Sequence, residues 1–226
     1  MKTLHAQISP RLLAELPRFF GGFEKALGEL FQNAHRAGAK TVWIAHNPET
    51  NLLVIADDGA GLDDPQKLLT AGETGWDEAR VIEPAGVGAF AILRAEFVSR
   101  VEYESFGAGR GEWTMTLTPA VLTGEPAQVI ACDNAIEAHG LRVTLHLQPG
   151  VSVNADLLRR VRGLYPFQVQ YTDGEEWRGL EPWREWEPDL RAATPVGWLE
   201  WNRRRATEMT RARTDDAVWE WRASSA

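Results

Sequence analysis

The spacing of apolar residues predicts a long amphipathic helix near the start of the chain. The apolar positions recur at steps of three and four residues and so share one helical face: Phe23, Leu27, Leu30, Phe31 and Ala34. Gly21 and Gly22 break the chain before this helix, and Gly38 follows it as a C-terminal cap. A shorter helix is predicted ahead of it, with Ser9 as its cap and Pro10 at its first position.

Short apolar runs bounded by turn residues predict strands over 41–45, 52–56, 97–104, 112–118, 128–132, 142–147 and 167–171. The turns at 46–51 and 107–111 predict two hairpins. Asn154 predicts the start of a further helix that ends at Gly163. Residues 86–93 indicate a glycine-rich entry into a short apolar helix. Residues 62–85 lack a clear period and predict a long, partly helical, mobile connection of the kind that forms lids.

Helices come first in this order, and strands follow with one helix in the middle. That order predicts an α+β fold with a mixed sheet and helices packed on one face. We expect one domain over residues 1–172 and a tryptophan-rich C-terminal extension over 173–226. The extension holds most of the tryptophans: Trp177, Trp183, Trp186, Trp198, Trp201, Trp219 and Trp221. It either wraps the edge of the sheet or forms a docking surface for a protein partner.

Composition and charge narrow the function classes. The chain has 226 residues, enough for one well-filled core, and a formal charge of −8, which disfavours binding of nucleic acid by the whole surface. Its single cysteine, Cys132, excludes an internal disulfide and a thiolate metal cluster. No apolar run approaches the ~20 residues of a membrane span, and the start carries no secretory signal. We therefore expect a cytoplasmic protein without membrane contact.

The polar face of the long helix is the first candidate for chemistry. Glu29 and Asn33 are four residues apart and lie on one side of it, while Leu30 and Phe31 point to the core. A carboxylate beside an amide oxygen suits a hydrated magnesium ion and an oriented water molecule. The alternative is an ordinary solvated helix face.

Two further segments carry glycines next to candidate ligand sites. Asp57 directly follows the predicted strand 52–56 and is followed by Gly59 and Gly61, which suits a carboxylate that accepts a hydrogen bond from the amine of a planar ring. The alternative is an acidic turn. Gly86 and Gly88 open the short apolar helix, where free backbone amides suit phosphates, although many helices begin with glycine. The segment 140–147, GLRVTLHL, indicates only a buried strand by itself.

Taken together and in order, these segments resemble the boxes of the GHKL ATPases, which include gyrase-type topoisomerases, heat-shock-protein-90 chaperones, histidine kinases and MutL. The boxes read ELFQNAHRAGAKTVWI, VIADDGAGL, EPAGVGAFAILRAEFVSRVEYES and GLRVTLHL. The last two are most similar to the chaperone branch. The resemblance implies a Bergerat-type two-layer α/β sandwich with a mostly antiparallel sheet. It also implies ATP as ligand, Mg²⁺ as cofactor, and a lid and dimer switch.

The resemblance also implies roles for single residues. Glu29 would be the general base that activates water, Asn33 would coordinate the magnesium ion, and Asp57 would receive the adenine amino group. The adenine pocket would be lined by Ala37, Gly59, Gly61 and Leu62. The lid, 63–85, would close at Thr74 and Gly75. The phosphates would be contacted by the backbone of Gly86, Val87, Gly88 and Ala89, with Lys40 either neutralising phosphate charge or lying as a surface residue at the helix end.

Several positions differ from the family pattern and keep other functions open. Arg36 stands where hydrolytic members often carry Asp, Glu83 where the chaperone box has glycine, and Leu141 where many members have Thr. Family members complete the phosphate site with a cation from a following domain, so we expect slow turnover by this chain, with a homodimer partner or a second subunit supplying that cation. A chaperone-like ATPase with a protein client is therefore weighed against two alternatives. One is a non-hydrolytic nucleotide-sensing module; the other is a MutL-like DNA-repair ATPase that uses the arginines at 203–205.

Overall fold

The computed structural model describes residues 15, 17–18, 21–70, 88–107, 112–132, 139–162, 165, 167–181, 190–194 and 197–201. Its helices are α2 (Phe23–Arg36), α3 (Gly88–Ala91) and α4 (Ala155–Arg162), with short 3-10 helices η2 (Pro65–Leu68) and η3 (Pro119–Thr123). The predicted first helix at Ser9 and Pro10 lies outside the described residues.

Eight strands form one sheet in the order β5-β4-β3-β6-β2-β1-β7-β8. They are β1 (Thr41–Asn47), β2 (Leu52–Asp57), β3 (Val98–Phe106), β4 (Glu112–Leu117), β5 (Gln128–Cys132), β6 (Gly140–Leu147), β7 (Gln168–Thr172) and β8 (Arg178–Gly179). All neighbours are antiparallel except β1 and β7, which are parallel. Strands β9 (Leu190–Thr194) and β10 (Gly197–Trp201) form a separate two-stranded sheet.

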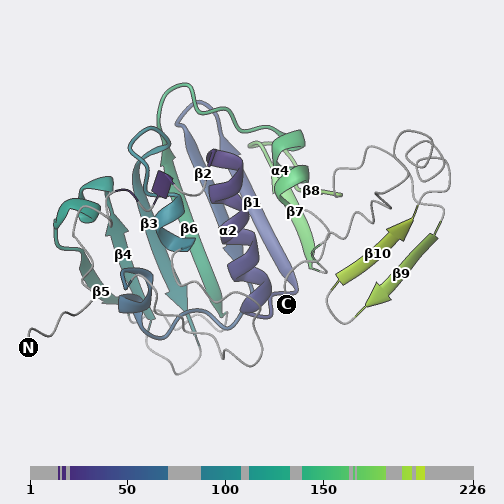
Figure 1. Cartoon of the computed structure of the whole chain (residues 1–226), viewed down its shortest axis with the longest axis horizontal. Coiled ribbons are helices and arrows are strands. Elements are labelled where there is room, and N and C mark those ends of the chain that lie inside the picture. The colour runs from purple at the N-terminus through teal and green to yellow at the C-terminus, as the bar shows by residue number, and fades with distance from the viewer. Residues whose placement is uncertain are drawn as a thin grey trace, which may run out of the picture.

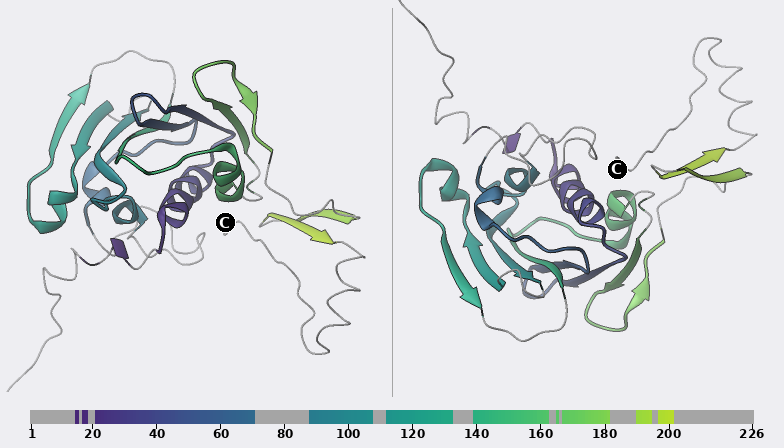
Figure 2. Two further views of the ribbon diagram at one scale, coloured as in Figure 1. Left: turned by 90° about the horizontal axis from the view of Figure 1, so that it is seen from above. Right: turned by 90° about the horizontal axis from the view of Figure 1, so that it is seen from below.

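The α+β class is confirmed: the sheet is mixed and mostly antiparallel, and α2, α3 and α4 lie on one of its faces (Figures 1 and 2). Alternation along the strands explains this two-layer arrangement. Val42 and Ile44 of β1 are fully buried, whereas Trp43 between them is 38% exposed. The buried strand residues pack against the apolar stripe of α2 that the spacing predicts, in which Leu27 and Phe31 are fully buried.

The predicted helix ends are confirmed where the structure describes them. Gly38 adopts a left-handed φ of 76° directly after α2, and its N–H donates to the carbonyl of His35 at 2.9 Å. The Asn154 side chain accepts the N–H of Leu157 at 2.9 Å and so begins α4. The strands differ from their predicted limits by one or two residues at most ends, where pairing with a neighbour extends or shortens them.

The order of the strands in space differs from their order in the sequence. Both predicted hairpins form, β1 with β2 and β3 with β4, but β6 lies between β2 and β3. This insertion brings the start of β6 next to the end of β2, where Asp57 lies opposite Leu141. Strand β8, beyond the domain boundary predicted at residue 172, is paired with β7 in the same sheet.

Candidate functional site

The polar face of α2 carries Glu29 and Asn33, and both side chains are half-buried. Their neighbours Leu30 and Phe31 are buried in the core, as the spacing predicts. Ala37 caps the helix at its C-terminal end, where its N–H donates to the carbonyl of Asn33 at 2.9 Å. Eight residues of α-helix span about 12 Å, so Glu29, Asn33 and Ala37 follow one another along a single edge of this helix.

Asp57 is the last residue of β2, and its carboxyl group is largely buried. Burial raises the pKa of this carboxyl from 3.8 to about 6, although hydrogen bonds from the backbone N–H groups of Gly59 and Leu141 oppose the rise. The Gly59 N–H donates to Asp57 Oδ1 at 2.8 Å. A desolvated carboxyl that retains accepting capacity is suited to binding a polar hydrogen-bond donor of a ligand.

The Asp57 loop, which we define as residues 57–62, lies against the end of α2 through Gly59 and Ala37. A Cβ atom at Gly59 would lie 2.6 Å from the Ala37 Cβ and 2.7 Å from Asp57 Oδ1, so only glycine fits without displacing them. The Ala60 N–H also donates to the Ala37 carbonyl at 2.9 Å. The predicted adenine-pocket residues Ala37, Asp57 and Gly59 therefore lie together.

Asp58 anchors the same loop, a role that the sequence motif alone does not indicate. Its Oδ1 accepts the N–H groups of Lys40 at 2.6 Å and Thr41 at 2.9 Å. The Lys40 side chain is exposed, and its positive charge contributes to the lowered pKa of His35, which burial lowers most. Lys40 thus lies at the C-terminal end of α2, as the sequence predicts.

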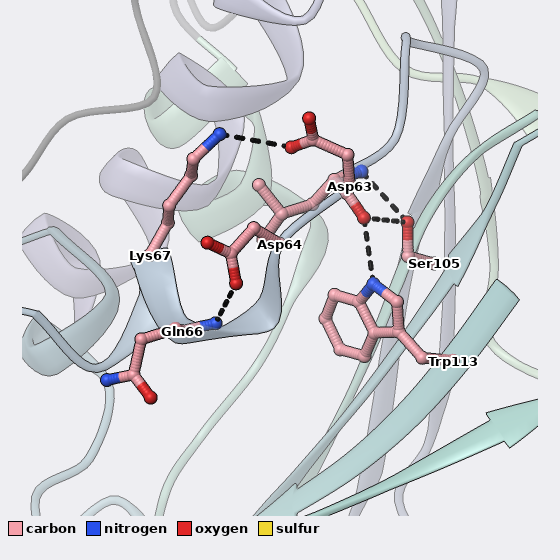
Figure 3. Close-up of polar contacts among 7 residues, drawn as sticks. Asp63, Asp64, Gln66, Lys67, Ser105 and Trp113 are labelled. Carbon is pink, nitrogen blue, oxygen red and sulfur yellow. Dashed lines mark hydrogen bonds and ion pairs between the residues drawn. The ribbon is translucent and has the colours of Figure 1, made fainter. Parts of the chain in front are cut away.

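The backbone of Leu62 has two hydrogen-bonding partners, the side chains of Ser105 and Trp113, which Figure 3 shows. Ser105 Oγ accepts the Leu62 N–H at 2.8 Å and donates to the Leu62 carbonyl at 2.9 Å, and the Trp113 indole donates to that carbonyl at 2.8 Å. Gly61, just before it, has a left-handed φ of 68°, and a Cβ there would lie 2.7 Å from the Phe106 carbonyl. Ser105 and Trp113 therefore fix the end of the Asp57 loop, and no local pattern in the sequence marks them for that task.

Glu29 lies against the first residue of α3. A Cβ atom at Gly88 would be 2.5 Å from Glu29 Oε2, so the lack of a side chain at Gly88 makes room for this carboxylate. Burial raises the pKa of the Glu29 carboxyl, and the positive charge of Arg36 opposes part of that rise. Burial and the negative charge of Glu29 raise the pKa of Tyr165 to about 12. The Glu29 carboxylate therefore lies among Gly88, Arg36 and Tyr165.

The start of β6 meets the Asp57 loop from the other side. An ideal Cβ at Gly140 would lie 1.8 Å from the Asp57 carbonyl oxygen, and the φ of Gly140 is 142°, so glycine is required there. The preceding residue, His139, places its Nδ1 2.9 Å from the Gly59 carbonyl oxygen. Leu141, which stands in place of the family's Thr, is partly buried against the core.

The structure thus groups the predicted residues in two places along α2: Asp57, Gly59 and Ala37 at its end, and Glu29 with Gly88 two turns earlier. Ala89 follows Gly88 in α3. The predicted contacts at Thr74, Gly75, Gly86 and Val87, most of the 63–85 lid and the arginines at 203–205 lie outside the described residues. A cavity of about 530 Å³ is lined by Phe23, Phe97 and Leu157 near the opposite end of α2, and none of the predicted site residues lines it.

Comparison with protein-family models and with curated proteins gives no match to this chain. The resemblance to the GHKL ATPases accordingly stands on the boxes themselves. In the part of the chain that the structure describes, the helices are too short or too polar to cross a lipid bilayer.

Proposed function

We propose that the chain is an ATP-binding domain of the GHKL type with a Bergerat-type sandwich, closest to the heat-shock-protein-90 branch. The observation that supports this most is the contact of three separate boxes around α2. The Asp57 loop contacts the end of the helix at Ala37. The box that begins EPAGVGAF contacts the middle of the helix, where Gly88 lies against Glu29. Chance glycines in unrelated turns would not be expected to contact one helix at both Glu29 and Ala37, which lie along the same edge of it.

The adenine end of the proposed site is centred on Asp57. Its buried carboxylate would accept the exocyclic amine of the base, with Ala37 and Leu62 as apolar neighbours. Because Gly59 and Gly61 have no side chains, the loop that carries Asp57 packs closely against the surrounding protein. The two anchors of the loop, Asp58 and Ser105, support a preformed pocket because they hold its backbone without entering it.

The phosphate end is centred on Glu29 and Asn33. Magnesium takes few protein ligands beside nucleotide phosphates and water, so the single amide oxygen of Asn33 fits it. Among the described residues, no group of three or more His, Cys, Asp or Glu side chains is arranged to hold a metal without a nucleotide. The ion would neutralise charge on the phosphates. Glu29, whose pKa burial raises, would act as a base stronger than an ordinary carboxylate toward water.

Phosphate release from Mg-ATP tests the hydrolytic part of this proposal. We expect slow release by the wild type, because family members complete the phosphate site with a cation from outside the ATP-binding domain, and release at background rate by Glu29→Ala. Glu24→Ala is the matched control: Glu24 lies on the same helix, is exposed and pairs with Arg160 at 3.2 Å, so its rate should equal that of the wild type. Equal release by Glu29→Ala and wild type would exclude Glu29 as the base.

One observation favours a second candidate, a nucleotide sensor that does not hydrolyse ATP. Arg36 stands where hydrolytic relatives often carry Asp, and its positive charge opposes part of the rise that burial causes in the pKa of Glu29, which makes Glu29 a weaker base than burial alone would. This candidate predicts saturable ATP binding, seen as a change in tryptophan fluorescence, with no phosphate release that depends on Glu29. Arg36→Asp would then be expected to raise the rate of release. Loss of nucleotide binding in both the wild type and this variant would argue against both candidates.

A further inference from the structure

The two edges of the eight-stranded sheet differ in how they are protected. At one edge β8 has only two residues, and Arg178 carries a charge that is paired with Asp173 at 2.7 Å. Short length and charge are the usual features that stop an edge strand from pairing with another chain. At the other edge β5 has five residues, Gln128 to Cys132, and none of them is charged or proline. Among the residues that the structure describes, these protective features are found at the β8 edge and not in β5.

The side chains of β5 are apolar on both faces of the sheet. Val129 lies opposite Met115 and Ala131 opposite Trp113, and both partners are buried on the side that packs against the helices. Ile130 lies opposite Thr114 on the other face. Val129 is 48% exposed and Ile130 is 63% exposed. An added strand would therefore cover apolar surface above and below the sheet as well as pair with its backbone.

We propose that β5 pairs antiparallel with β5 of a second copy of this chain, so that two eight-stranded sheets join edge to edge. The two-fold axis passes through Ile130, because only this register pairs all five residues of each strand. Ile130 then faces Ile130 of the second copy, Val129 faces Ala131, and Gln128 faces Cys132. This pairing requires no bound nucleotide.

A second copy fits this edge because the strand is complementary to itself. No charge opposes a like charge in the proposed register, whereas the chain as a whole carries a formal charge of −8 that disfavours close approach elsewhere. Like charges placed directly opposite each other across a strand pair are destabilising, and this pairing has none. In this register each apolar side chain of β5 faces an apolar side chain of the second copy, because Ile130 lies opposite Ile130 and Val129 lies opposite Ala131.

The contact between the two β5 strands is small. Five residues of strand are about 17 Å long, so the pairing buries less surface than a standard stable interface does. We therefore expect dimerisation that depends on protein concentration. Sedimentation velocity over roughly 1 to 200 µM should show a monomer that converts to a dimer.

A designed disulfide tests the register. In Gln128→Cys, the new thiol would face the native Cys132 of the second copy, and opposed residues of an antiparallel pair have the Cα spacing that a disulfide needs. The two cysteines cannot bond within one chain, because four residues along a strand separate them by about 13 Å. Under mild oxidation of the protein without nucleotide, we expect this variant to form a covalent dimer, shown on a non-reducing gel.

Val129→Cys is the matched control for the disulfide. Its side chain points to the opposite face from Cys132, so we expect no more covalent dimer than in the wild type. Covalent dimer in the wild type itself, through two copies of Cys132, would overturn the register. Equal yields from Gln128→Cys and Val129→Cys would also overturn it.

A charged edge tests the contact independently of any covalent bond. Ile130→Lys should remain a monomer throughout the concentration range, because two lysines would meet at the axis. Gln168→Lys adds the same charge to an exposed residue of β7 and should dimerise like the wild type. Circular dichroism melts verify that both variants fold. A wild type that stays monomeric at every concentration, or an Ile130→Lys variant that dimerises equally well, would overturn the proposal.

Discussion

Asp57 should cost the protein stability at neutral pH, and Asp57→Asn reveals that cost. The folded state raises the pKa of this carboxyl to about 6, from 3.8 when it is exposed. Between these two values the folded chain holds the proton more tightly than the unfolded chain. Stability therefore falls as the pH rises through that window and stays level above it. This sign is opposite to that of a carboxyl held in an ion pair.

The magnitude follows from the same two pKa values. Their difference corresponds to about 3 kcal/mol of unfolding free energy once Asp57 is fully ionised. Most of it develops between pH 4.5 and pH 7.5, where the change amounts to about 2 kcal/mol. Asparagine has no such titration. The hydrogen bonds that asparagine makes differently from aspartate shift stability equally at all pH values, so the pH dependence is the quantity to compare.

Urea unfolding of the wild type and Asp57→Asn at pH 4.5, 6.0 and 7.5 measures this difference. We expect the stability of Asp57→Asn relative to the wild type to increase by about 2 kcal/mol from the lowest to the highest pH. Asp63→Asn is the control: Lys67 lowers the pKa of this exposed carboxyl below 3.8, so its titration lies below the tested range, and the stability of this variant relative to the wild type should stay nearly constant from pH 4.5 to 7.5. A difference between Asp57→Asn and the wild type that does not change with pH would refute a buried, desolvated Asp57.

Further expectations concern Glu29 and Leu62. Gly88→Ala should be as stable as the wild type, because the added methyl group displaces only the flexible end of the Glu29 side chain. This variant should bind ATP but release phosphate more slowly. An unchanged rate of release would contradict the placement of the Glu29 carboxylate. Gly28→Ala, with open space where the new Cβ would lie, should raise the unfolding free energy by up to ~1 kcal/mol in urea titrations, and a loss of stability would contradict the open space at this helix position. Ser105→Ala should cost about 1–3 kcal/mol by the same assay, because the Leu62 backbone loses both of its hydrogen bonds to that hydroxyl; no loss would contradict the anchor.

Local patterns in the sequence predicted the elements of this fold well. The apolar stripe from Phe23 to Ala34 and the alternation in β1 result from burial of one face, and each segment shows this pattern in its own sequence. The hairpin of β1 and β2 also depends on a short turn. These features needed no knowledge of the rest of the chain.

Features that depend on distant segments could not be predicted in this way. Strand β6 lies between β2 and β3, and β7 runs parallel to β1, because of packing between segments far apart in the chain. Gly140 signals nothing by itself, yet it is the residue that lets β6 approach the Asp57 carbonyl. Likewise Ser105 lies 43 residues from the Leu62 backbone that it holds.

In the candidate site too, local features could be predicted from the sequence and long-range features could not. Asp57 and Gly59 were recognised because a strand end followed by glycines is a local pattern, and the structure places them against Ala37. The effect of Arg36 on Glu29 was not predicted, because it depends on burial of the carboxylate between α2, α3 and Tyr165. Charge interactions of this kind require the folded arrangement.

Calorimetric titration with nucleotides tests the central proposal most directly. We expect the wild type to bind Mg-ATP and Mg-ADP saturably. We expect Mg-GTP to bind more weakly, because guanine presents a carbonyl oxygen where adenine offers its amine to the Asp57 carboxylate. Asp57→Asn, shown by its urea curve to be folded, should lose most of the affinity for ATP. An absence of binding by the wild type, or equal affinity in Asp57→Asn, would contradict an adenine site at the end of β2.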